Sequence, residues 1–109
     1  MVVLFSDDEL RRLCEVEREA KKRLGEPCAR KLRTRLADLM AAPNVGALIA
    51  GRPHPLKGDR AGQLAVDLTG MVRLCFEPAD PVPALDAAGG VDWPRVTTIR
   101  IVFLGDYHD

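Results

Sequence analysis

Two short segments of this sequence carry side chains suited to cleaving a phosphodiester. The side chains are those of His54, Lys57 and Arg60 in the first segment, and of Asp106, Tyr107 and His108 in the second. Histidine has an unperturbed pKa close to neutrality, which makes it the first candidate for a general acid or base. Lysine and arginine can hold a phosphate group. The two segments therefore predict an RNA-cleaving site, provided that the fold brings them together.

Cleavage of RNA through its own 2′-OH needs three kinds of group. A base takes the proton of the ribose 2′-OH, an acid protonates the leaving 5′-oxygen, and cations offset the charge of the pentacoordinate phosphorane. The two segments, with Arg73, supply all three. Simpler interpretations stay open for single residues: His54 could bond to the backbone, Lys57 and Arg60 could be solvated, and the terminal residues could fray.

The composition is that of one ordinary globular domain. The 109 residues are enough for a single hydrophobic core, and 47% of them are hydrophobic while 29% are charged. No apolar run approaches the roughly 20 residues that span a bilayer. The apolar start of the chain is too short, and too closely followed by acidic residues, for a secretion signal. We therefore expect one cytoplasmic domain over residues 1–109, without a membrane partner.

The cysteines do not predict a metal site. Cys14, Cys28 and Cys75 are odd in number and lack the close spacing of metal ligands. We expect reduced cysteines in core positions, no metal and no cofactor. A crosslink between Cys14 and Cys28 stays open as an alternative.

The net charge of zero hides an uneven distribution of charge. Residues 10–35 contain ten of the sixteen basic residues and four acidic ones, whereas residues 77–94 contain four acidic residues and no basic one. Such asymmetry is typical of a basic face that meets an anionic partner. The alternative, which charge alone favours, is that the lysines and arginines solvate exposed helix faces.

The first half of the chain predicts two antiparallel amphipathic helices. Ser6 and Glu9 have the spacing of a capping box, and apolar residues follow near the 3.6-residue period as far as Gly25, a natural C-terminal cap. Pro27 suits the first turn of a second helix, and Pro43 ends it. Both helices need an apolar surface to cover.

Strands in the rest of the chain supply that surface. They are predicted at residues 2–5, 64–68, 72–76 and 96–104. The second and third form a hairpin with a tight turn at Thr69 and Gly70. In the last strand Ile99, Ile101 and Phe103 share one face, and its near-continuous apolarity predicts a place in the sheet interior.

Residues 78–94 break the strand pattern with four prolines and an acidic character. We expect a mobile loop insertion whose Trp93 anchors back on the body of the protein. The order strand, helix, helix, strand, strand, strand predicts an α+β fold, with both helices on one face of a mainly antiparallel sheet of about four strands. Arg73 then points away from the helices, where residues 52–60 and 106–108 can meet it.

Three motifs of the chain, taken in order, carry a resemblance to a known family. They are His54-Pro55-Leu56-Lys57-Gly58-Asp59-Arg60-x-Gly62, Arg73-x-x-Phe76 and Asp106-Tyr107-His108. In these motifs the chain resembles the HigB branch of the RelE/ParE superfamily of bacterial toxin–antitoxin toxins. The resemblance implies a RelE-like (microbial-RNase-like) fold and ribosome-dependent cleavage of mRNA in the A site. It also implies inhibition by a HigA-like helix-turn-helix antitoxin, and contact with operator DNA only through the antitoxin complex.

The resemblance also assigns roles to single residues. The active-site positions that carry over are His54, Asp106, Tyr107 and His108. Lys57 and Arg73 match basic positions expected to hold the scissile phosphate. We expect the two histidines to act as base and acid, in an order left open. Tyr107 would stack on a base or share proton transfer, and Asp106 would orient a histidine.

The basic residues outside this set are expected to contact RNA on the ribosome through phosphates, independently of sequence. They are Arg30, Lys31, Arg33, Arg35, Arg52 and Arg60. Residues 78–94 depart from the compact family pattern and could alter contacts with the antitoxin or the ribosome.

Three alternatives to a nuclease remain. A ParE-like toxin shares the fold but acts on DNA gyrase through protein contacts, and it would not need His54 and His108. An inactive toxin homologue could serve as a corepressor. A stand-alone nucleic-acid-binding module would explain the basic helices but not the histidines. Growth arrest on expression separates the active toxins from the last two, and transcript cleavage or DNA damage separates the two toxin classes.

Overall fold

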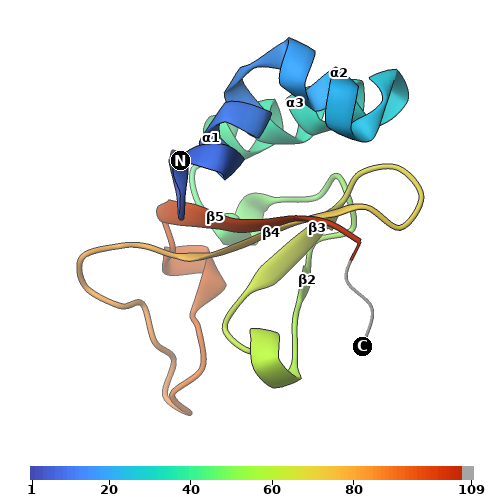
Figure 1. Ribbon diagram of the computed structural model, residues 1–109. Helices are drawn as coiled ribbons and strands as arrows, with labels where there is room; N and C mark the ends of the chain where they lie inside the picture. The colour runs from blue at the N-terminus through green and yellow to red at the C-terminus, as the bar shows by residue number, and fades with distance from the viewer. Residues whose placement is uncertain (107–109) are drawn as a thin grey trace.

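Three helices cover one face of a five-stranded sheet in the computed structural model, which describes residues 1–106 (Figure 1). The helices are α1 (Asp8–Glu15), α2 (Glu17–Leu24) and α3 (Glu26–Ala41), and the short 3-10 helices are η1 (Val45–Ala47), η2 (Gly58–Arg60) and η3 (Trp93–Arg95). The strands are β1 (Val2–Phe5), β2 (His54–Pro55), β3 (Leu64–Asp67), β4 (Arg73–Pro78) and β5 (Thr98–Gly105). None of these helices is both long enough and apolar enough to cross a membrane.

The sheet has the order β1-β5-β4-β3-β2, with β1 parallel to β5 and every other pair antiparallel. The predicted α+β fold is confirmed, and so is the interior position of β5. The fifth strand is β2, where His54 pairs with Ala65 and Pro55 pairs with Leu64. A two-residue strand leaves no periodic pattern in a sequence, so β2 was not among the predicted strands.

The helical layer differs from the prediction in two places. The first helix is interrupted at Val16, which has φ −105° and ψ 104°, so that α1 and α2 are separate helices. Leu13 and Ala20, on either side of the break, are both buried. The expected Ser6 cap is wrong, because it is the Asp7 carboxylate that accepts the N–H of Leu10, at 2.8 Å. Either residue type caps a helix well, so the spacing alone did not decide between them.

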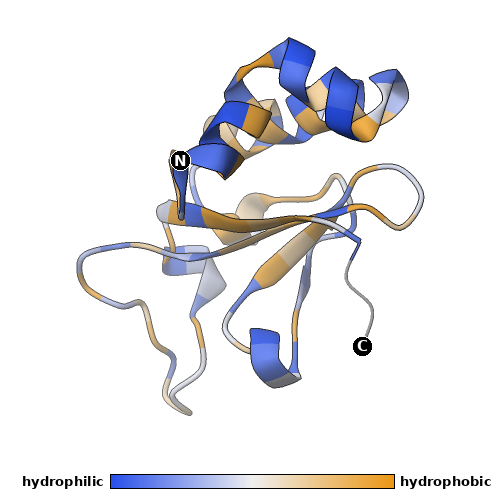
Figure 2. Cartoon of the chain, viewed as in Figure 1, coloured by the Kyte–Doolittle hydropathy of each residue, from blue (hydrophilic) through white to orange (hydrophobic). Residues whose placement is uncertain are grey.

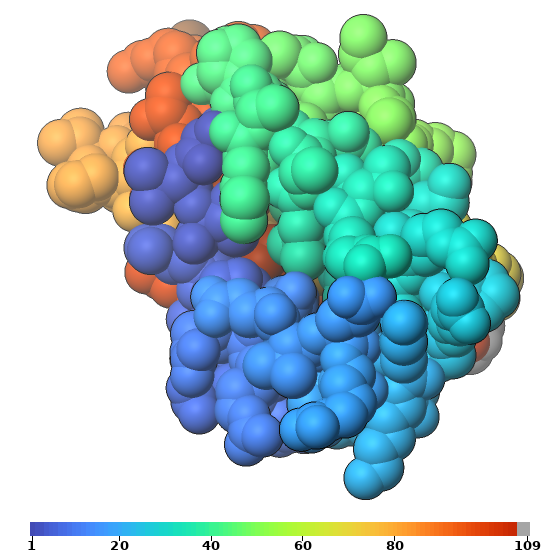
Figure 3. Space-filling view, turned by 90° about the horizontal axis from the view of Figure 1, so that it is seen from above, coloured from blue at the N-terminus to red at the C-terminus, as the bar shows by residue number. Residues whose placement is uncertain are grey.

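The core lies between the helices and the sheet. Its largest fully buried side chains come from α3, β4 and β5 and include Leu32, Leu39, Leu74, Phe76 and Ile101. Figure 2 shows apolar residues along the strands and on the helix faces turned toward them, with hydrophilic residues on the outer helix faces. Seen from above in Figure 3, the helices and the segment after α3 cover most of that side of the molecule.

A β-bulge changes the face of the last part of β5. Cys75 pairs with Phe103, but the next residue of β4, Phe76, pairs with Ile101, so that Val102 is an extra residue on β5. Phe103 therefore faces away from the core, while Leu104 packs against it. The expectation that Phe103 shares a face with Ile101 is wrong, because a bulge shifts the side-chain alternation by one residue.

The two loops that were expected around β4 are both ordered by hydrogen bonds. The hairpin turn includes Met71 as well as Thr69 and Gly70, because the N–H of Val72 donates to the Thr69 carbonyl at 3.0 Å. The prediction of a two-residue turn is therefore wrong.

Within residues 78–94, Leu85 bridges to Val91, and the Asp86 carboxylate accepts the N–H groups of Ala88 and Gly90, each at 2.9 Å. Trp93 packs against the core, as predicted. The mobility of this loop stays a prediction.

Candidate functional site

Two rows of side chains cross the sheet face that is turned away from the helices. The first row is His54, Ala65, Cys75 and Phe103, and the second is Asp67, Arg73 and Gly105. Directly paired residues on neighbouring strands place their side chains on one face. Leu74 and Phe76 alternate with the members of these rows and are buried in the core. The expected direction of Arg73 is confirmed, and we call the face formed by the two rows the site face.

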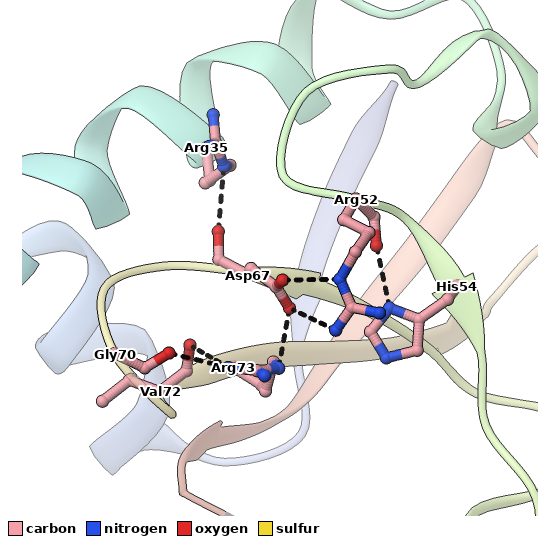
Figure 4. A network of polar contacts seen from close by, with 7 residues as sticks. All are labelled: Arg35, Arg52, His54, Asp67, Gly70, Val72 and Arg73. Carbon is pink, nitrogen blue, oxygen red and sulfur yellow. Dashed lines mark hydrogen bonds and ion pairs between the residues drawn. The ribbon is translucent and has the colours of Figure 1, made fainter.

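The Asp67 carboxylate is the centre of a cluster of arginines (Figure 4). Its Oδ1 lies 2.7 Å from Nε of Arg73, directly across the hairpin. Its Oδ2 accepts from Nε of Arg52 at 2.9 Å, and Nη2 of Arg52 lies 3.5 Å from Oδ1. The Arg73 side chain is only 13% exposed, whereas that of Arg52 is 65% exposed. One carboxylate thus holds two guanidinium groups and leaves the cluster with an excess of positive charge.

Arg35 reaches the same residue from the helix side. Its Nε donates to the Asp67 carbonyl oxygen at 3.0 Å, and its Nη1 lies 3.3 Å from the Asp38 carboxylate of the same helix. The side chain is 14% exposed. Arg35 was predicted to lie on an outer helix face and to contact RNA. The outer-face position is wrong, because the side chain connects α3 to the end of β3, and the RNA contact stays a prediction.

His54 has a defined orientation on the site face. Its Nδ1 lies 2.8 Å from the carbonyl oxygen of Arg52. A carbonyl can only accept, so Nδ1 carries the hydrogen and the neutral ring has its lone pair on Nε2, the form that a general base requires. Arg52 itself has φ +51° and is the one residue other than glycine, within residues 1–106, with a positive φ. Such a conformation costs an L-residue about 1–2 kcal/mol, and here it aims the Arg52 carbonyl at His54.

Arg60 covers another part of the site face. Its guanidinium carbon lies 4.3 Å from the centroid of the Phe103 ring, a cation–π arrangement, and its Nη1 is 3.3 Å from Oε1 of Gln63. Beneath it, Cys75 is fully buried. Burial raises the pKa of the Cys75 thiol to about 11, against the opposite effect of Arg60 and Arg73. The thiol therefore stays protonated at neutral pH and is no nucleophile.

Cys28 is also buried, which confirms that these two cysteines fill core positions, and Cys14 is partly buried. All three are free thiols, so the alternative of a Cys14–Cys28 crosslink does not hold in this structure. Within residues 1–106 no group of three or more His, Cys, Asp or Glu side chains is placed to hold a metal ion.

The remaining predicted site residues are less closely joined to this cluster. Lys57 is exposed, immediately before η2, and has no ion pair with any residue of the described chain. Asp106 follows Gly105, whose register partner is Arg73, so the chain leaves β5 beside the arginine cluster. Tyr107 and His108 lie outside the described residues, and their placement stays a prediction.

The basic residues of α3 lie in the other layer of the molecule. Arg30 is 65% exposed and pairs with Glu26 at 3.2 Å, and Arg33 is 51% exposed and pairs with Glu17 at 2.7 Å. Lys31 is partly buried. Helix α3 covers the face opposite the site face (Figure 1). Arg30, Lys31 and Arg33 are therefore separated from His54 and Arg73 by the thickness of the sheet and core.

Asp67 is the site residue that sequence reasoning missed. The signal was partial, because the alternation puts Asp67 and Arg73 on one face, but they lie directly opposite each other only with the three-residue turn of the structure. A carboxylate facing a guanidinium across a hairpin is a stabilising pair. The contributions of Arg35 and Arg52 were beyond such reasoning, since they reach Asp67 from segments far away in the sequence.

Comparison with known proteins gives a likeness of fold. No family model and no curated protein matches the sequence. Among solved structures, the chain is similar to a YoeB/ParE toxin from Agrobacterium tumefaciens, with a TM-score of 0.59 and 16% sequence identity. The match covers 99% of this chain and 100% of the other. The predicted RelE-like fold is thereby confirmed.

Proposed function

We propose that this chain is the toxin of a toxin–antitoxin system and cleaves mRNA on the ribosome. Two observations support the proposal. The fold resembles that of a YoeB/ParE toxin over nearly the whole chain, and His54 lies on the same sheet face as Arg52, Arg60 and Arg73. The orientation of His54 carries the argument, because its Nδ1 is engaged and its Nε2 is the basic atom.

The reaction that these groups fit begins at a ribose 2′-OH. A histidine, His54 or His108, takes the 2′-OH proton, and the 2′-oxygen forms a bond to the neighbouring phosphorus. The bond from phosphorus to the 5′-oxygen then breaks, and the other histidine protonates that oxygen. The products are an RNA with a 2′,3′-cyclic phosphate and an RNA with a 5′-OH. We assign Tyr107 to base stacking or proton transfer, and Asp106 to orienting a histidine.

Arg73 is suited to the phosphorane by the way it is held. Its Nε pairs with Asp67, and its Nη1 donates to the carbonyl oxygens of Gly70 and Val72 at 3.2 and 3.4 Å. Nη2 has no hydrogen bond within residues 1–106, so it is the group that we assign to the phosphate, together with Lys57. A fixed donor needs no reorganisation as charge develops, and this is what makes electrostatic stabilisation effective.

The partners follow from the same proposal. The exposed guanidinium groups of Arg30 and Arg33, with Lys31, would contact ribosomal RNA phosphates, whereas Nε of Arg35 is occupied by its contact with β3. Arg52 and Arg60 would contact the mRNA. The proposed antitoxin is of the HigA-like helix-turn-helix class and brings the toxin to operator DNA. The proposed place of action is the cytoplasm.

Primer extension on a reporter mRNA after brief induction tests the proposal. Wild type should produce discrete cuts that require translation, and His54→Ala and His108→Ala should abolish both the cuts and the growth arrest. Lys57→Ala should weaken cleavage, whereas Lys22→Ala, at an exposed lysine of α2, is the matched control and should not. Arrest with DNA damage and no cuts would favour a ParE-like toxin acting on gyrase. Absence of arrest would favour a corepressor.

A further inference from the structure

We propose that Asp67 is a positioning residue, which fixes Arg73 for the scissile phosphate and lowers the positive charge of the arginine cluster. The inference rests on the proposed nuclease function and extends it to a residue that no catalytic assignment above includes. Three features of the structure support it: the contacts that the carboxylate makes, the way in which Asp67 is itself held, and the balance of charge.

The carboxylate contacts restrict both arginines. Nε of Arg73 and Nε of Arg52 lie 2.7 and 2.9 Å from the two oxygens of Asp67. The contact from Arg52 is a charge-assisted hydrogen bond, which is the strong kind, and the contact from Arg73 is an ion pair. The ion pair with Asp67 and the hydrogen bonds to Gly70 and Val72 hold the Nε and Nη1 atoms of the Arg73 guanidinium (Figure 4).

Asp67 is anchored on both sides of its own backbone. Its N–H donates to the Gly51 carbonyl oxygen at 2.6 Å, and its carbonyl oxygen accepts from Nε of Arg35 at 3.0 Å. The carboxylate is therefore a fixed point between the loop that carries His54 and the strand that carries Arg73. A group fixed in this way can transmit the position of one catalytic segment to the other.

The balance of charge gives a second role to the same carboxylate. Two guanidinium groups share the one carboxylate, so Asp67 lowers the positive charge that Arg52 and Arg73 present to a phosphodiester. Asp67→Asn would remove that negative charge and would also release Arg73 from its ion pair. RNA should then bind more tightly before reaction, while the arginine is less well placed for the transition state. Catalysis requires stabilisation that is greater in the transition state than in the ground state.

The experiment is single-turnover cleavage of mRNA on programmed ribosomes, at increasing toxin concentration. Asp67→Asn should lower the half-saturating concentration by about threefold at low salt and lower the maximal rate by about 100-fold, the loss expected for a 1 Å misplacement. Asp92→Asn is the matched control. Asp92 is 28% exposed and pairs with Arg95 at 3.5 Å, whereas Asp67 is 25% exposed. The half-saturating concentration and the maximal rate of Asp92→Asn should both equal those of wild type.

Asp67→Glu separates charge from position. It keeps the carboxylate but lengthens its stem, so the half-saturating concentration should stay near that of wild type while the maximal rate falls. If the role of Asp67 were merely structural, Asp67→Asn would raise the half-saturating concentration and lower the maximal rate. That result overturns the inference. The inference is also overturned if Asp67→Asn and Asp92→Asn have the same half-saturating concentration and the same maximal rate.

The Arg73 Nε–Hε resonance in a 15N spectrum gives a readout that does not require cleavage. In wild type and Asp92→Asn the Nε proton should exchange slowly with water, and in Asp67→Asn it should exchange fast, with tighter binding of added inorganic phosphate. A wild type that makes no cuts but shows these spectra refutes the proposed function and keeps the positioning role. An unchanged resonance in Asp67→Asn refutes the positioning role, whether or not the wild type cuts.

Discussion

Gly51→Ala tests whether the link from α3 to the site is as tight as the structure shows. Gly51 has φ +82°, and a Cβ added there would lie 2.5 Å from Nε of Arg35 and 3.0 Å from its Cδ. Real contacts are not that short, so the Arg35 side chain must move. When it moves, the hydrogen bond from Arg35 Nε to the Asp67 carbonyl is lost.

Two contributions give the expected loss in the free energy of unfolding of Gly51→Ala. An L-residue in the left-handed region costs about 1–2 kcal/mol, and a lost hydrogen bond from a charged group costs about 1.5–3 kcal/mol. The free energy of unfolding should therefore fall by about 2.5–5 kcal/mol. Gly89→Ala is the matched control, because Gly89 has φ +86° with no atom within 4 Å of an added Cβ. It should lose only the backbone contribution of about 1–2 kcal/mol.

Urea unfolding measures both variants. The urea midpoint should fall further for Gly51→Ala than for Gly89→Ala. The slope of the unfolding free energy against urea concentration should stay unchanged. In an Arg35→Ala background the obstructing Nε and Cδ atoms are gone, so Gly51→Ala should lower the free energy of unfolding by no more than Gly89→Ala does. Equal losses for the two glycine variants in the wild-type background, or an unchanged loss in the Arg35→Ala background, would refute the reasoning.

Three further predictions follow from single contacts. Arg73→Lys keeps the charge but cannot hold Asp67 and a phosphate at once, so single-turnover cleavage should slow by about 100-fold; a rate equal to that of wild type would contradict this. Burial raises the pKa of Cys75 to about 11, so the fold favours the protonated thiol, and stability should be constant below about pH 9 and fall as the pH rises toward 11. The urea midpoint should fall less over this range for Cys75→Ala, and an equal fall would contradict the assignment. Replacement of Arg30 and Arg33 together by Gln should weaken ribosome cosedimentation and reduce its salt dependence with little change in the urea midpoint, because both ion pairs are exposed, and unchanged binding would remove α3 from the docking surface.

The elements that sequence reasoning predicted correctly are those with a sustained pattern. The alternation in residues 64–68 and 72–76 led to a hairpin whose strands are β3 and β4, and the apolarity of residues 96–104 led to an interior strand that is β5. The direction of Arg73 followed from the same alternation. Pro43 was predicted to end the second helix, and α3 ends at Ala41.

The errors arise where one residue changes the pattern or where distant segments meet. The bulge at Val102 reverses the face of Phe103, and nothing in an alternating apolar run marks the residue at which it occurs. The break at Val16 is of the same kind. Arg35 has the spacing of an exposed helix residue, and its contact with Asp67 depends on how α3 lies over β3. Tertiary contacts of this kind leave no local signal.

The most direct test of the proposed reaction is cleavage of an mRNA that carries one 2′-deoxynucleotide at the scissile position. The mRNA is bound in programmed ribosomes and compared with the all-ribose mRNA, with wild-type protein and His54→Ala side by side. Attack by the 2′-OH predicts that wild type cuts only the all-ribose mRNA, leaving a 2′,3′-cyclic phosphate, and that His54→Ala cuts neither. Cleavage of the deoxy-substituted mRNA at the same position, or cleavage by His54→Ala at the wild-type rate, would contradict it.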